Sequence, residues 1–231
     1  FVRRAKSRGV PPEEARGNPL QVAAYAEYQA ALGRTGAVDF ADLVMLMVGA
    51  LEASDALRSA VCSELEAVVV DEFQDTSAQQ LKFLEALVAD RHGKLTAVGD
   101  PRQRIFSFQG SCGGQFEALK QRLGAAEVSL DENFRSTANV CALAGLVLGS
   151  AGGAAASGAR IVPRHPAGAG RPIHLVACRT PACELFHVQA TVLQSRSEGM
   201  EWRDLAVLCR TVKATLEVAD ALRALGVPVV V

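Results

Sequence analysis

A short apolar run that ends in two adjacent acids constrains the fold of this chain more than any other feature. The run is Val68, Val69 and Val70, and Asp71 and Glu72 follow it directly. A continuous β-branched run is typical of a strand buried on both faces of a parallel sheet. Because ligands of open parallel sheets gather at the carboxyl ends of the strands, the two acids are predicted to lie where a ligand would bind.

Strand and helix patterns alternate along most of the chain. Strands are predicted over 67–70, 95–100, 127–130, 173–177, 205–209 and 228–231. Helices are predicted between them, over 78–89, 115–123, 138–148, 181–197 and 213–225. This alternation predicts an α/β fold built on a parallel sheet.

Helical patterns precede the first strand, and a segment of small residues interrupts the series. Residues 1–35 are expected to be helical and polar, with an Ala-rich helix over 22–32 that stops at Gly33. Another helical stretch is expected over 39–60. Residues 149–170 are rich in Gly, Ala and Pro, which predicts a flexible loop.

Composition excludes several classes of protein. Hydrophobic residues make up 49% of the chain, enough for a sizeable core, and the net charge of -1 gives no overall basic field. Any nucleic-acid contact must therefore be a local patch. No apolar run approaches the roughly 20 residues needed to span a bilayer. The six cysteines form no CxxC pair, and most lie in apolar stretches, which favours buried thiols in a reducing, intracellular compartment over a zinc site.

Two adjacent carboxylates at a strand end suit phosphate chemistry. One carboxylate can hold Mg²⁺ through its water shell, because magnesium keeps most of its waters. The next can orient and deprotonate a water molecule for attack on a γ-phosphate. The alternative is an acidic strand end that simply starts a solvated loop, and Asp71 and Glu72 alone favour this alternative.

A longer set of segments resembles one family. Residues 71–76 (DEFQDT) resemble the Walker B or DExx motif of superfamily 1 helicases of the UvrD, PcrA and Rep type. Segments 98–111 (VGDPRQRIFSFQGS) and 130–137 (LDENFRST) resemble the third and fourth motifs of that family. Segments 39–43 (DFADL) and 205–211 (LAVLCRT) resemble two further stretches of it. The order and spacing agree over nearly the whole chain.

The resemblance implies a RecA-like P-loop NTPase sheet that is incomplete. Residues 1–35 would be the end of a helical inserted subdomain, and 36–132 the C-terminal part of the first RecA-like motor domain. Residues 133–231 would begin the second motor domain, with 149–170 as its flexible loop. The chain begins at Phe1 rather than Met, and we expect it to be a fragment.

The resemblance also implies roles for individual residues. Asp71 would bind Mg²⁺ and Glu72 would activate water, while Gln103 would contact the γ-phosphate of ATP. Arg135 would act as an arginine finger, and Phe134 would pack beside the nucleotide base. The alternatives are a loop residue bonded to backbone for Gln103 and a structural ion pair for Arg135.

Two aromatic residues mark the expected path of single-stranded DNA. Phe106 and Phe108 fall where the family places Tyr and Trp, and their alternate spacing puts both rings on one side of an extended segment. Rings so placed can stack on successive bases. The alternative is ordinary core packing. Gln109 stands where the family usually has Arg, which removes one charge from this segment.

The implied function is that of an ATP-dependent 3′ to 5′ DNA helicase or translocase acting in repair or recombination. The cofactors would be ATP and Mg²⁺, and the partner would be single-stranded DNA. A phosphate loop of the form G-x-x-x-x-G-K-[ST] is absent from the 231 residues, so the isolated chain is expected to be inactive. The alternatives are a catalytically inactive remnant that binds DNA or a partner protein, and a P-loop ATPase that does not act on nucleic acid.

Overall fold

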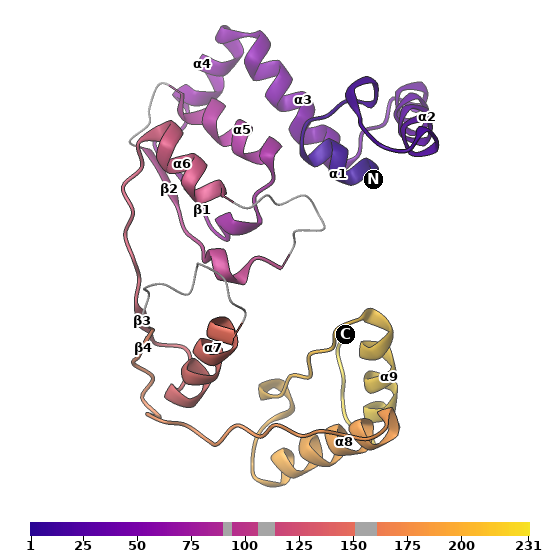
Figure 1. Ribbon diagram of the computed structural model, residues 1–231, viewed down its shortest axis with the longest axis vertical. Helices are drawn as coiled ribbons and strands as arrows, with labels where there is room; N and C mark the ends of the chain where they lie inside the picture. Colours follow the sequence, from indigo (N-terminus) through magenta and orange to yellow (C-terminus); the bar gives the residue numbers. More distant parts are fainter. Residues whose placement is uncertain (90–93, 106–113, 151–160) are drawn as a thin grey trace. The chain divides into compact units, whose positions relative to one another are not determined.

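The computed structural model describes residues 1–89, 94–105, 114–150 and 161–231 (Figure 1). Phe106 and Phe108 lie outside the described residues. The chain divides into two compact units, Phe1–Gly168 and Ala169–Val231. The first unit combines helices with parallel strand pairs, as the predicted α/β class requires, and the second combines helices with extended segments.

The first unit begins with helices. These are α1 (Val2–Ser7), the 3₁₀ turn η1 (Pro12–Glu14) and α2 (Pro19–Thr35). The side chain of Asn18 accepts the backbone N–H groups of Leu20 and Gln21, which begins α2 earlier than predicted. The predicted end at Gly33 is wrong: the helix continues until Gly36, which adopts the left-handed conformation that ends it.

The predicted helix over 39–60 is two helices, α3 (Phe40–Ala53) and α4 (Asp55–Ser63). They are separated by Ser54, whose extended backbone breaks the helical path and whose hydroxyl accepts the N–H of Leu57. Asp39 and Asp42 form a reciprocal capping box at the start of α3. The helical character of this stretch could therefore be predicted from local sequence, whereas the break between the two helices depends on the single capping residue Ser54.

A parallel pair of strands positions the acidic turn. Strand β1 (Val68–Val70) pairs with β2 (Leu95–Ala97), with Val70 opposite Ala97. Helices α5 (Ala78–Val88) and α6 (Gln115–Leu123) cover one face of this pair. The buried core between them comprises Phe73, Leu81, Leu84 and Leu119.

The prediction that β1 is buried on both faces is wrong. Val68 and Val70 pack against the core, but Val69 points to the opposite face and is 72% exposed. The period of two along a strand explains the alternation, because α5 and α6 both pack on the side that Val68 and Val70 occupy. A continuous valine run does not by itself reveal how many layers cover a strand.

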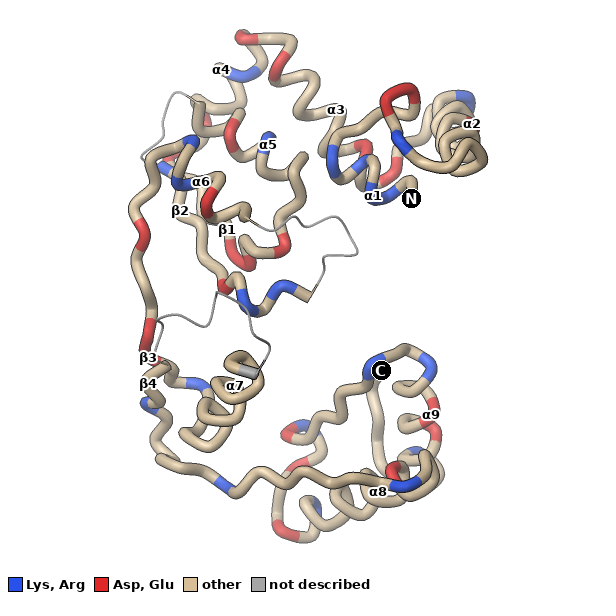
Figure 2. The backbone as a smooth tube through the Cα atoms, in the orientation of Figure 1, with Lys and Arg blue, Asp and Glu red and all other residues tan. Residues whose placement is uncertain are grey.

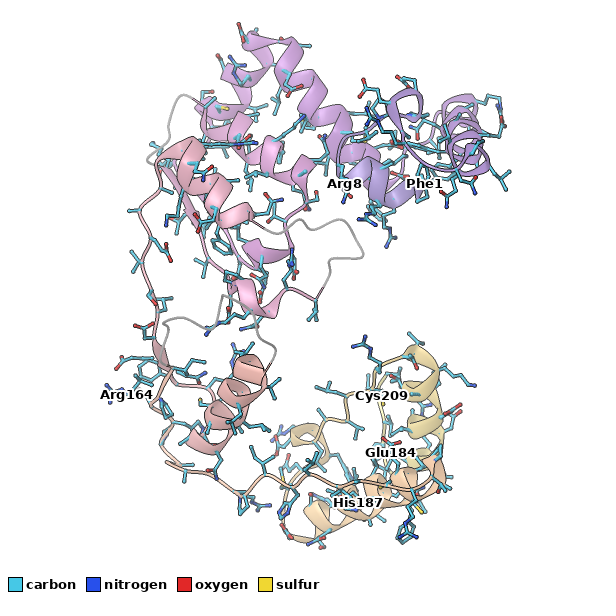
Figure 3. The ribbon with its side chains drawn as sticks, viewed as in Figure 1. Phe1, Arg8, Arg164, Glu184, His187 and Cys209 are labelled. Atoms are coloured by element: carbon cyan, nitrogen blue, oxygen red, sulfur yellow. The ribbon has the colours of Figure 1, made fainter. Side chains whose placement is uncertain are left out.

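The predicted strand over 127–130 is also wrong. Val128 and Leu130 are exposed, and pairing begins downstream at β3 (Glu132–Asn133), which lies parallel to β4 (Val162–Pro163). An ion pair of 2.6 Å between Arg164 and Glu132 joins the two strands (Figure 3). Helix α7 (Ala138–Ser150) follows β3.

The first compact unit extends to Gly168. Pairing of β3 with β4, and the hydrogen bond from the N–H of Ala138 to the carbonyl of Gly168, join these segments within that unit. The predicted boundary after residue 132 concerns motor domains rather than compact units, and it stays a prediction. Part of the expected loop over 149–170 is ordered structure, namely the end of α7 and β4.

The second unit consists of two helices and extended segments. Helix α8 (Pro181–Ser197), the 3₁₀ turn η7 (Trp202–Asp204) and α9 (Val212–Arg223) surround a core of Val192, Leu222 and Val227. The segments 173–177, 205–209 and 228–231, predicted as strands, are not paired as strands in this unit. Strand pairing depends on long-range partners that an apolar pattern does not specify.

Within the described residues, no helix combines the length and the apolar character needed to cross a membrane.

Candidate nucleotide-hydrolysis site

The acidic pair lies on a tight turn at the carboxyl end of β1. Asp71 and Glu72 are both exposed, and the N–H of Glu72 donates to Asp71 Oδ1 at 2.9 Å. Glu72 has φ 50° and ψ 40°, and it is the non-glycine residue with positive φ in the described part of the chain. A side chain in this left-handed region costs about 1 to 3 kcal/mol, so the surrounding contacts must hold the turn.

Phe73 supplies the main anchor of this turn. Its ring is fully buried and packs edge to face on Phe116, with ring centroids 5.0 Å apart. Its N–H donates to the carbonyl of Val98 at 2.9 Å, and the N–H of Val98 donates to the carbonyl of Val70 at 2.8 Å. The turn after β1 is therefore tied to the end of β2.

Gln74, which was not among the residues predicted from the sequence, connects Glu72 to the neighbouring strand end. Its side chain is buried, with 4% exposure. Its Nε2 donates to Glu72 Oε2 at 2.6 Å, and its Oε1 accepts the N–H of Asp100 at 3.1 Å. The sequence signal that could have identified Gln74 is its position as a long polar residue directly after the aromatic Phe73 of the 71–76 motif.

Asp100 organises the segment after β2. Its carboxylate accepts the N–H and the Nε–H of Arg102, each at 3.0 Å, and the Nε2 of Gln103 at 3.2 Å. Burial alone would raise the pKa of Asp100, but these hydrogen bonds and the positive charge of Arg102 lower it. Gln103 is exposed on the 3₁₀ turn η4 (Pro101–Gln103), where its side chain donates to the Asp100 carboxylate and its backbone N–H donates to the Asp100 carbonyl at 2.9 Å.

The parallel pairing brings these predicted residues to one edge of the sheet. Asp71 and Glu72 follow β1, and Gln103 follows the adjacent parallel strand β2. Acidic residues follow β1 and basic residues follow β2 along the backbone in Figure 2. The edge therefore carries carboxylates, a neutral amide and guanidinium groups, the combination that handles phosphate and its metal ion.

A cleft of about 330 Å³ opens beside the acidic turn. It is lined by Asp71, Glu72, Asp75 and Thr76 together with residues of β1 and α5. Asp75 Oδ1 is buried and has no hydrogen-bond partner among the described residues, so this wall can still accept a donor or a hydrated cation. Since Mg²⁺ needs only one or two carboxylates besides its waters, Asp71 fits the predicted metal-binding role.

A larger metal cluster has no support in the described residues. No group of three or more His, Cys, Asp or Glu side chains is arranged there to hold an ion.

Phe134 and Arg135 lie on a different strand pair. Both are exposed on the turn between β3 and α7, and Phe134 is 66% exposed. The side chain of Asn133 accepts the N–H groups of Arg135 and Ser136 at 3.0 and 2.7 Å, which fixes the backbone of this turn. The structure thus brings together Asp71, Glu72 and Gln103, while Phe134 and Arg135 lie on the turn that follows β3.

Fold and site together define an α/β protein with an acidic turn at the carboxyl edge of a parallel strand pair. A family model described as "UvrD/REP helicase N-terminal domain" matches residues 1–123. The chain therefore belongs to the UvrD/REP helicase family. The matched range includes the acidic turn, both strands of the first sheet and helices α1 to α6.

Curated relatives carry helicase names. The chain is 36% identical over 154 residues to ATP-dependent DNA helicase UvrD2 of Mycobacterium tuberculosis, covering 64% of this chain and 21% of that protein. It is 29% identical over 209 residues to ATP-dependent DNA helicase PcrA of Leuconostoc citreum, covering 88% and 27%. It is 30% identical over 157 residues to DNA helicase II of Escherichia coli, covering 64% and 21%. The matched region thus spans about a fifth to a quarter of these relatives.

Proposed function

We propose that this chain forms part of an ATP-dependent DNA helicase or translocase and contributes the water-activating half of its ATP site. The observation that supports this most directly is the shared sheet edge of Asp71, Glu72 and Gln103. The helicase names of the relatives support the same proposal. In this proposal the first sheet is the incomplete part of a RecA-like domain.

Each residue of the edge has a task in hydrolysis. Asp71 holds Mg²⁺ through its water shell, and bound Mg²⁺ neutralises charge on the phosphates. Glu72 accepts a proton from the attacking water. Gln103, whose amide can donate and accept, senses the γ-phosphate. Arg135 supplies a guanidinium to the developing charge, and Phe134 packs beside the base.

Domain organisation and DNA binding follow from the same proposal. Residues 1–35 end an inserted helical subdomain, 36–132 complete the first motor domain and 133–231 begin the second. Single-stranded DNA stacks on Phe106 and Phe108, and translocation runs 3′ to 5′ during repair or recombination. Such a protein works where DNA is, in the cytoplasm of a prokaryote or the nucleus or organelle of a eukaryote.

The first experiment uses the 231 residues alone. Because they contain no phosphate loop with its Lys, purified chain should show no DNA-stimulated ATP hydrolysis above background. Robust hydrolysis that disappears in Glu72→Gln would show that the phosphate loop is dispensable and that this part of the proposal is wrong.

The second experiment uses the complete gene product that carries this segment. Arg135→Ala should lower kcat by about 10³-fold or more, as loss of an arginine finger does, while affinity for a labelled oligonucleotide stays within twofold. Equal loss of turnover and DNA affinity would assign Arg135 a structural role. DNA binding without any hydrolysis by the unmodified protein would instead support the inactive remnant.

A further inference from the structure

A buried glutamine amide joins the two halves of the acidic edge. Gln74 lies beneath the turn, with 4% exposure, and each end of its amide has a partner. Nε2 donates to Glu72 Oε2 at 2.6 Å, and Oε1 accepts the N–H of Asp100 at 3.1 Å. A buried amide with both ends satisfied has one orientation, because reversing it would break both hydrogen bonds.

The hydrogen bond to Glu72 limits where its carboxylate can point. Glu72 is exposed, and an exposed glutamate samples several rotamers. A donor held rigidly in the core selects one of them. Since a base must lie within hydrogen-bond reach of the proton that it abstracts, the selected rotamer decides where water can be activated.

The hydrogen bond to Asp100 extends the connection to the second strand. The Asp100 carboxylate accepts Gln103 Nε2 at 3.2 Å, so Glu72, Gln74, Asp100 and Gln103 form one linked series. Gly99 leaves the space that this series needs: a Cβ there would collide with Gln74 Oε1 and lie 2.9 Å from the Phe73 nitrogen.

We infer that Gln74 is a positioning residue. It holds the carboxylate of Glu72 at a fixed place relative to Gln103, the residue proposed to sense the γ-phosphate. The inference rests on the proposed function, because it concerns the same hydrolysis site. Gln74 does not contact the reacting atoms in this scheme and acts through Glu72. A glutamine that only filled the core would need neither the donor facing Glu72 nor the acceptor facing Asp100.

Two substitutions in the complete gene product test this role. Gln74→Met keeps the length of the side chain and removes both hydrogen bonds. It should lower kcat about 10- to 100-fold, with KM for ATP within twofold, because misplacing a catalytic group by about 1 Å costs up to 10²-fold. Gln74→Glu keeps an acceptor for Asp100 and replaces the donor by an oxygen.

The Gln74→Glu variant separates positioning from core filling. Its carboxylate has nearly the size of the amide and keeps an acceptor for the N–H of Asp100, but it places an oxygen against Glu72 Oε2. The kcat should therefore fall as in Gln74→Met, with KM for ATP within twofold. A residue that only filled the core would lose stability without this split between kcat and KM.

Gln115→Met is the matched control. Gln115 is also buried, with 7% exposure, and donates to the Thr76 carbonyl at 3.4 Å without touching Glu72 or Asp100. It should lower the melting temperature and leave kcat within twofold. If Gln74→Met does not fold, the kcat and KM of Gln74→Glu decide alone.

Two results would overturn the inference in different ways. Folded Gln74 variants whose kcat and KM match those of the unmodified protein, while Glu72→Gln still abolishes turnover, would show that Gln74 has no positioning role. Turnover that survives Glu72→Gln would show that the proposed hydrolysis site is wrong, and the positioning role would fall with it.

Discussion

The ammonium group of Lys6 lies 2.8 Å from Asp42 Oδ1, and both side chains are almost completely buried, at 1% and 6% exposure. Lys6 also donates to Asp39 Oδ2 at 2.8 Å. Tyr28 donates to the same Asp39 oxygen, and Gln29 donates to Asp42 Oδ1. One buried charge network therefore joins α1, α2 and α3, and it fixes the N-terminal helices to the segment that leads into β1.

Replacing Lys6 by Met should be strongly destabilising. Met fills similar volume, but the two carboxylates would remain partly or wholly buried without their cation. Removal of one partner from a buried pair typically costs about 3 to 5 kcal/mol. Urea unfolding followed by near-UV circular dichroism of Tyr25 and Tyr28, both in α2, reports on this unit.

Lys120→Met is the control for that measurement. Lys120 pairs with Glu127 at 2.8 Å, but the two side chains are 40% and 70% exposed. Exposed pairs contribute little, so this substitution should leave the unfolding curve unchanged. Equal effects of the two Lys→Met changes would mean that burial of Lys6 is not what makes its pairs important.

Acid should weaken the same network. Burial alone would raise the pKa of Asp39, but hydrogen bonds from Lys6, from the N–H of Asp42 and from Tyr28 lower it to about 2. The unfolded carboxyl titrates near its ordinary value of about 3.9, so the ionised native form stabilises fully above that pH. This contribution should disappear as pH falls from about 4 to about 2.

Asp39→Asn provides the comparison for the acid experiment. Urea unfolding of both proteins at intervals from pH 6 to pH 2 should show a gap in stability that narrows through the window from 4 to 2. A constant gap across the whole range would contradict the assignment of the lowered pKa to Asp39.

Helices could be predicted from the sequence more closely than strands. Helices over 115–123 and 181–197 have the predicted bounds, because apolar spacing and capping residues are local signals. The predicted strand over 127–130 failed because pairing with 162–163 begins only at Glu132. That partner lies about thirty residues away, and no local pattern in 127–137 specifies it.

The site shows the same division between local and long-range information. Asp71 and Glu72 could be proposed from the sequence because they follow a valine run directly. Gln103 could be proposed because its segment, 98–111, resembles the third motif of the helicase family. Gln74 was missed because its importance depends on the N–H of Asp100, 26 residues away, which only the β1–β2 pairing brings to it. The left-handed backbone of Glu72 likewise has no signature in its residue type.

Gly99→Ala should disturb the link between the two strand ends. The added Cβ would collide with Gln74 Oε1 and lie 2.9 Å from the backbone nitrogen of Phe73, whose side chain is fully buried. Overpacking of this kind costs about 1 to 3 kcal/mol in urea unfolding. Gly49→Ala is the control: it lies inside α3 with nothing within 4 Å of its Cβ position, and it should stabilise by about 0.5 to 1 kcal/mol.

The backbone of Glu72 permits a test of strain that is separate from its chemistry. Glu72→Gly and Glu72→Ala both remove the carboxylate and the hydrogen bond from Gln74, but only glycine adopts φ 50° without steric cost. The glycine variant should therefore be more stable than the alanine variant by about 1 kcal/mol, since the left-handed region costs an L-residue that much. Urea unfolding of the two proteins measures the difference directly. Equal stabilities would indicate that the turn after β1 relaxes on substitution, and that the surrounding contacts, Phe73 above all, do not enforce its conformation.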